Sequence, residues 1–272
     1  MRSSNPVFSS LTKTKSAVNH GFPQAGYNPY GQYVDPRTPQ MSRERAMTVD
    51  DIISKTGITV GVIIAFAVAN FALALVSPGL TMLLTMVGMI GGFITVLISS
   101  FSKSYGSPIV TIAYAIFEGL FVGGISLVLS GWMVGGTDAG VLIGQAVVAT
   151  LGVFVGMLWV YKAGVIRVTP KFTRFLMGAL IGVVVLSLAN LVGAMFFGFN
   201  PLRGDGPMAI IFSLVCIVLA ALSFLQDFDA ADRLVRSGAP AKMAWGVALG
   251  LAVTLVWLYT EILRLLSILR NN

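Results

Sequence analysis

Charged residues are scarce in this sequence of 272 residues. Asp, Glu, Lys and Arg make up 11% of the chain, whereas a soluble domain usually carries about a quarter. So few charges cannot cover a water-facing surface, and the mean hydropathy is +0.86. We therefore expect a protein whose solvent is lipid, rather than a soluble enzyme.

Cysteine and histidine are nearly absent. The single cysteine, Cys216, lies in an apolar run, so an intramolecular disulfide and a cysteine-based metal site are excluded. The single histidine, His20, lies in the polar N-terminal segment, which excludes a His-based intramembrane triad or zinc site. We expect no enzymatic activity and no cofactor.

The first 47 residues have few aliphatic side chains and no helical or strand period. Their Gly, Pro, Tyr and Asn content is typical of a disordered segment, although the tyrosines could also contact a partner or lipid headgroups. They lack the apolar core of a signal peptide. We predict a disordered tail over 1–47, followed by a short helix with Thr48 as N-cap and Asp50 and Asp51 in its first turn.

Seven apolar runs follow, each near the ~20 residues that a helix needs to cross a bilayer. Turn signals such as Ser77-Pro78-Gly79 and Asn200-Pro201 separate them. The sequence therefore predicts an all-α polytopic membrane domain over 48–272, with helices at about 58–76, 79–100, 107–130, 139–161, 173–199, 207–226 and 244–268.

Basic residues indicate the orientation of this domain. The net charge is +7, but 15 of the 18 Lys and Arg fall in the tail and in alternate loops on one side. Cytoplasmic loops carry such an excess, so we predict a cytoplasmic N-terminus and, after seven crossings, an outside C-terminus. This distribution points to the lipid bilayer, not to nucleic acid, as the partner of the basic residues.

Glycine spacing indicates close helix packing. Pairs four residues apart let helices in lipid approach one another. Such pairs include Gly119/Gly123, Gly152/Gly156, Gly178/Gly182 and Gly246/Gly250.

Acidic residues inside the apolar runs are the candidate site residues, because a charge at bilayer depth costs about 2.5–3.5 kcal/mol on insertion scales. Glu118 is the deepest carboxylate by sequence position. It is either an ion or proton ligand that faces the bundle interior, or a protonated side chain that hydrogen-bonds to a neighbouring helix.

The segment QDFDAADRLVR closes the sixth apolar run. On a helical wheel, Asp229 and Asp232 can pair with Arg233 and Arg236 at spacing i,i+4 on a solvated face. Asp227 points the other way, onto the apolar stripe, and needs a partner from another helix.

Other polar residues have simpler interpretations. Glu261 can pair with Arg264 three residues on, or can belong to an ion pathway. Interhelical hydrogen bonding is the first interpretation of Asn70, Gln145, Asn190 and Thr254.

Several motifs together resemble the Bax inhibitor-1 (transmembrane Bax-inhibitor-motif) family. They are SFLQDFDAADRL and LYTEILRLLSIL, with MTVDDIISKTG, YAIFEG and MRSSNPVF resembling its bacterial, actinobacterial-type branch, and the resemblance covers about 47–270. It implies six helices around a central seventh, a bacterial plasma membrane protein, and a pH-sensitive calcium leak channel in which two aspartates, on the sixth and seventh helices, sense protons.

The transfer of these residues is partial. Asp227 matches the acid of the sixth helix, but Thr254 stands at the position of the second acid. Glu261 is seven residues further, about 10 Å outward. We therefore expect Asp227 and a second carboxylate, for which Glu118 is our own candidate, to sense pH and to bind Ca²⁺ weakly, with Lys103 as a possible latch on Asp227.

The leading hypothesis is thus a calcium or other cation leak gated by protonation of buried carboxylates. A regulator that binds a membrane protease or quality-control complex, with the tail as its docking segment, is the alternative. A proton-coupled transporter would usually show inverted repeats, and no clear repeat is found.

Overall fold

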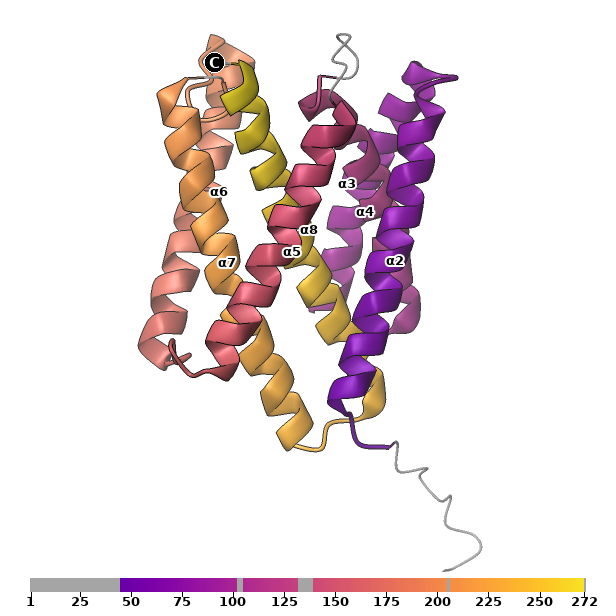
Figure 1. The fold of residues 1–272 in the computed structure, drawn as a ribbon, viewed down its shortest axis with the longest axis vertical. Coiled ribbons are helices and arrows are strands. Elements are labelled where there is room, and N and C mark those ends of the chain that lie inside the picture. The colour runs from indigo at the N-terminus through magenta and orange to yellow at the C-terminus, as the bar shows by residue number, and fades with distance from the viewer. Residues whose placement is uncertain (1–44, 102–104, 132–138, 205, 272) are drawn as a thin grey trace, which may run out of the picture. The chain divides into compact units, whose positions relative to one another are not determined.

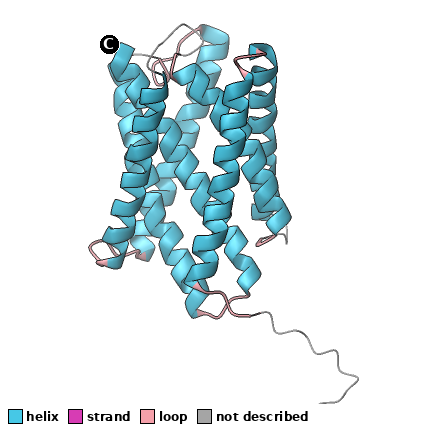
Figure 2. Ribbon diagram, turned by 45° about the vertical axis from the view of Figure 1, so that its right-hand side comes forward, coloured by secondary structure: helices cyan, strands magenta, loops and turns pink. Residues whose placement is uncertain are grey.

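The computed structural model describes residues 45–101, 105–131, 139–204 and 206–271. These residues form long helices joined by short connections, and no strand is found among them, although Ala46 and Pro240 form an isolated β-bridge (Figure 2). The elements are α2 (Val49–Leu73), α3 (Pro78–Phe101), α4 (Pro108–Leu129), α5 (Ala139–Lys162), α6 (Pro170–Phe197), α7 (Pro207–Arg236), the 3₁₀ turn η3 (Ala241–Met243) and α8 (Ala244–Asn271).

Each of these seven α-helices is long and apolar enough to cross a membrane. They lie alongside one another, with the start of α2 and the α7–α8 connection at one end and the end of α8 at the other (Figure 1). Only helices and closed barrels satisfy all backbone polar groups in lipid. The predicted all-α polytopic membrane fold is confirmed.

Two helix boundaries differ from the prediction by more than three residues. The short helix predicted after Thr48 is continuous with the first spanning helix, and Thr48 and Asp51 cap it reciprocally. At the other boundary, α7 runs ten residues past the predicted end at 226. The apolar run ends there, but the i,i+4 ion pairs that follow continue the helix.

Residues 45–47, predicted to belong to the disordered tail, are bonded to the α7–α8 connection. The Met47 N–H donates to the Ala239 carbonyl at 2.7 Å, and the Ala241 N–H donates to the Arg45 carbonyl at 2.8 Å. The Met47 side chain is 2% exposed. We call Arg45–Met47 the strap. Its hydrogen bonds show that the predicted end of the disordered tail at residue 47 was wrong. The remainder of the predicted tail lies outside the described residues.

The last helix is the most buried of the bundle. About 72% of the apolar window of α8 is buried, compared with 50% for α7 and 11% for α6. It packs against α2, α4, α5 and α7, while α3 packs mainly on α4 and α6 on α7. The last helix therefore lies among four direct neighbours, in agreement with the expected central position.

Only one of the four named glycine pairs lies at a helix crossing. A Cβ on Gly119 would meet the Ile63 carbonyl oxygen at 2.6 Å, and one on Gly123 would meet that of Ala67 at 2.4 Å. The pairs on α5 and α6 face open space. On α3, Gly88 allows a similar approach to the α4 backbone, so the described close crossings join α4 to α2 and α3.

The first prediction concerns orientation. A reporter that is active only in the cytoplasm should work when fused after Lys171 or Arg236 and fail after Arg203 or at Asn272, because 15 of 18 basic residues lie on one side. Activity of the fusion at Asn272 would contradict the assigned orientation.

The second prediction concerns the α2–α4 crossing. Gly123→Ala should lower the thermal unfolding temperature in detergent, because the new methyl group clashes with the α2 backbone and overpacking costs about 1–3 kcal/mol. Gly182→Ala, which adds a methyl group where no atom lies within 4 Å, is the matched control and should not destabilise the protein. Equal unfolding temperatures for both variants would refute the close crossing.

Candidate functional site

Asp227 on α7 and Thr254 on α8 form the site to which the sequence pointed. The Thr254 hydroxyl donates a hydrogen bond of 2.7 Å to Oδ2 of Asp227. The two side chains are partly or fully buried between the helices. Asp227 was expected to need a partner from another helix. That partner is Thr254, which stands at the position of the second acid in the family resemblance.

The local sequence explains why Asp227 faces α8. Ser223 and Ala231, one turn before and one turn after it, are buried on the same stripe of α7. Phe224 and Phe228 pack against Phe154 of α5 with ring centroids 5.2 and 5.5 Å apart. This aromatic cluster fixes the rotation of α7, because a rotation that released Asp227 would break it.

The opposite face of α7 carries the two predicted ion pairs. Asp229 pairs with Arg233, and Asp232 pairs with Arg236 at 2.9 Å. Both arginines are largely exposed. The predicted division of this segment into a solvated and a bundle-facing side is confirmed.

Asp227 lies deeper than its position in the sequence suggested. Because α7 continues to Arg236, Asp227 is more than two turns from the end of the helix. Its partner Thr254 is ten residues into α8, about 15 Å from the start of that helix. The site is thus well inside the bundle, not at the end that carries the α7–α8 connection.

Tyr105, in the α3–α4 connection, approaches this site from the end of the bundle at which α8 begins. Its ring lies where a side chain on Gly246 of α8 would be, with ring atoms 2.6–2.8 Å from the position of that missing Cβ. Burial raises the pKa of the Tyr105 phenol, and the charge of nearby Asp227 raises it further. Lys103, the predicted latch, lies outside the described residues.

Glu118 occupies a different interface. Its Oε2 is 2.8 Å from the position of a Cβ on Gly92 of α3, so the glycine makes room for the carboxylate. The α4–α8 contacts Thr111 to Trp245 and Ser126 to Tyr259 set the register of two parallel helices. Midway between them, Glu118 is level with Ala252 and within one turn of Thr254. It is therefore as deep as Asp227, not deeper.

Depth alone does not bring the two carboxylates together. Ala252, level with Glu118, belongs to the cluster shared by α2, α4 and α8. Thr254 is about 200° further around the helix and faces α7. The body of α8, about 10 Å wide, stands between Glu118 and Asp227. The Ca²⁺ site predicted for these two residues stays a prediction, and no group of three or more His, Cys, Asp or Glu suited to a metal is found among the described residues.

Glu261 lies toward the other end of α8 and is 3% exposed. Its Oε1 forms an ion pair of 3.3 Å with Arg203 of the α6–α7 connection. The spacing to Arg264 had suggested a partner on the same helix. Arg203 could have been singled out because it lies apart from the loops that hold most of the Lys and Arg residues. Nothing in the spacing of Tyr105 indicated its approach to Asp227.

The remaining polar residues act mostly as interhelical links. The Asn70 amide donates to the Leu120 carbonyl of α4 at 2.6 Å and to Thr85 of α3 at 3.2 Å. Asn190 bonds to Asn200 and to the Leu202 N–H in the α6–α7 connection. The interpretation of Asn70 and Thr254 as interhelical hydrogen-bond groups is confirmed.

Comparison with known proteins agrees with these features. The model of a family described as "Bax inhibitor 1 like" matches residues 5–271, further toward the N-terminus than the motifs alone indicated. No curated protein matches the chain. Given a family match over nearly the entire chain, this seven-helix membrane protein belongs to the Bax inhibitor 1 like family.

Proposed function

We propose that this protein is a pH-sensitive leak pathway for calcium or other cations, gated by protonation of Asp227. The observation that carries the proposal is the hydrogen bond from Thr254 to Asp227, between the most buried helix and a neighbouring helix, both long and apolar enough to span the membrane. An ionisable residue in such a helix is by default a functional candidate. We further propose a bacterial plasma membrane location with the N-terminus in the cytoplasm, and no enzymatic activity.

Protonation would change the site in two ways. It removes the negative charge of the Asp227 carboxylate at the α7–α8 contact. It also replaces a charge-assisted hydrogen bond from Thr254 with a weaker neutral one. The α7–α8 contact therefore differs in strength between the two protonation states, which is the requirement for a population shift between conformations.

Cation passage needs oxygen ligands that bind weakly enough to release the ion. Asp227 supplies a carboxylate and Thr254 a hydroxyl on the α7 side of α8. Glu118 supplies a second carboxylate at the same depth on the α4 side. We propose that these act as separate sites and that Ca²⁺ is the permeating ion, not a resident cofactor.

The ion pair of Glu261 with Arg203 has a different role in this proposal. It lies toward the end of α8 away from the strap, and its positive partner disfavours cations nearby. We assign Glu261 to the outer end of the pathway, not to proton sensing.

The third prediction tests Asp227. Asp227→Asn mimics the protonated state with little change in shape, so calcium flux in proteoliposomes of the purified protein should lose most of its pH dependence. Asp229→Asn and Asp232→Asn change carboxylates on the solvated face and should leave the pH profile nearly unchanged. Glu118→Gln should lower the flux itself, because it removes a ligand of the pathway.

Two outcomes would reject the channel. One is the absence of cation flux through wild-type protein at every pH, and the other is identical behaviour of all four variants. The regulator that binds a membrane protease or quality-control complex would then be the better proposal.

The fourth prediction tests Thr254. Thr254→Val keeps the shape of the side chain but removes the donor to Asp227. Because a hydrogen bond to a charged carboxylate favours the charged form, Asp227 should accept its proton at higher pH in this variant. The transition in flux should therefore move to higher pH, whereas Thr260→Val, whose hydroxyl bonds to the Trp257 carbonyl of its own helix, should leave the transition in place. A shift to lower pH in Thr254→Val would contradict the role of Thr254.

A further inference from the structure

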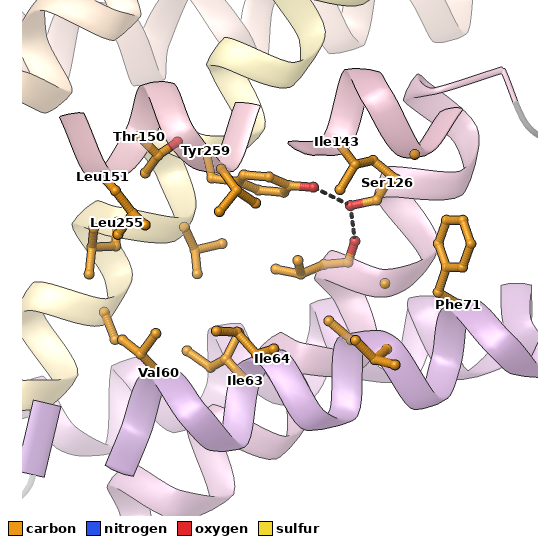
Figure 3. Close-up of a pocket in the computed structure, with 18 residues that line it drawn as sticks. Val60, Ile63, Ile64, Phe71, Ser126, Ile143, Thr150, Leu151, Leu255 and Tyr259 are labelled. Atoms are coloured by element: carbon orange, nitrogen blue, oxygen red, sulfur yellow. Dashed lines mark hydrogen bonds between the residues drawn. The ribbon is translucent and has the colours of Figure 1, made fainter. Parts of the chain in front are cut away.

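A deep apolar groove opens on the side of the bundle between α2 and α5. It has a volume of about 420 Å³, and its floor is formed by α4 and α8. In Figure 3, Val60, Ile63 and Ile64 of α2 lie across from Thr150 and Leu151 of α5. α2 packs on α3, α4 and α8, and α5 on α7 and α8; no extensive α2–α5 interface closes the opening within the described residues.

The groove is continuous with the lipid-facing surface. Its rim residues Ile64 and Val68 on α2 are 56% and 62% exposed, and Val147 and Leu151 on α5 are 41% and 51% exposed. Both helices span the membrane, so the medium at this rim is bilayer hydrocarbon. The floor reaches Leu255 and Tyr259 of the most buried helix.

The hydroxyl groups of the groove are already bonded within the protein. Ser126 donates to the Val122 carbonyl at 2.6 Å and is 2.8 Å from the Tyr259 hydroxyl, so the tyrosine donates to the serine (Figure 3). Thr150 donates to the Ala146 carbonyl at 2.7 Å. The other lining residues are apolar or glycine. These walls suit hydrocarbon and present no site for a polar ligand or an ion.

The dimensions select the kind of hydrocarbon. From Val60 to Phe71 the groove follows α2 for about 16 Å, close to the ~15 Å of one bilayer leaflet. The groove is open along its side to the lipid-facing surface, so an acyl chain of the surrounding bilayer reaches it directly.

We propose that one acyl chain of a membrane phospholipid occupies this groove and packs against α8. The chain enters sideways from the leaflet near the C-terminal end of α8 and fills the seam that α2 and α5 leave open. Its binding is independent of ion conduction and rests on the shape and polarity of the groove.

Photolabelling tests this proposal. The full chain is reconstituted into phosphatidylglycerol vesicles that contain a lipid with a diazirine on its acyl chain, irradiated, and mapped by peptide mass spectrometry. Lipid around the bundle labels the outer faces of α5 and α6 in any case. Labelling of α8 at Leu255–Tyr259, which are largely covered by other helices, requires a chain inside the groove, and this is the expected result.

Matched phenylalanine variants on α5 provide the control. Gly140 lines the groove and Gly152 does not, and neither has an atom within 4 Å of a newly added Cβ. Gly140→Phe should reduce the labelling of α8 several-fold, and Gly152→Phe should leave it unchanged. Val147→Phe fills the groove from another position and serves if Gly140→Phe fails to fold.

Three outcomes would overturn the proposal. The first is labelling of α5 and α6 without labelling of α8 in the wild-type protein. The second is equal labelling of α8 in the wild-type protein and in the two variants that fill the groove, Gly140→Phe and Val147→Phe. The third is a cross-link between two copies of the chain through Leu255–Tyr259, which would assign the groove to a second copy.

Discussion

The burial of α8 is the constraint on which the rest of the bundle depends. Four helices pack directly on it, and its residues supply much of both apolar cores. A helix surrounded in this way meets side chains instead of lipid, so its buried polar groups need partners within the protein. Thr254, Tyr259 and Glu261 satisfy this requirement with α7, with α4 and with the α6–α7 connection, respectively.

The same constraint orders the candidate site. Asp227 is presented to α8 because the aromatic cluster with α5 fixes the rotation of α7. Glu118 is accommodated because Gly92 leaves space on α3. Since α8 lies between the two carboxylates, each belongs to a different helix interface, Asp227 to α7–α8 and Glu118 to α3–α4.

The length of the apolar runs predicted the seven helices, and the helical wheel of the QDFDAADRLVR segment predicted the side of α7 that carries Asp227. They could not predict the end of α7, because hydropathy reports where lipid contact stops, not where the helix stops. The Arg203–Glu261 pair joins residues 58 positions apart, and Tyr105 reaches α8 from a loop. Such contacts depend on the lateral arrangement of helices, about which the period of a single helix carries no information. The ordered strap escaped prediction because main-chain hydrogen bonds hold much of it.

The strap has a practical consequence. Main-chain hydrogen bonds do not depend on side-chain identity, so substitutions at Arg45 or Ala46 leave the Arg45–Ala241 and Met47–Ala239 bonds in place, and proline at position 47 would remove one of them. The strap also ties the start of α2 to the connection between the two helices that carry Asp227 and Thr254. A pulling force on the chain just ahead of residue 45 is therefore transmitted to the α7–α8 hairpin, and affinity tags or tethers for force spectroscopy belong at the C-terminus.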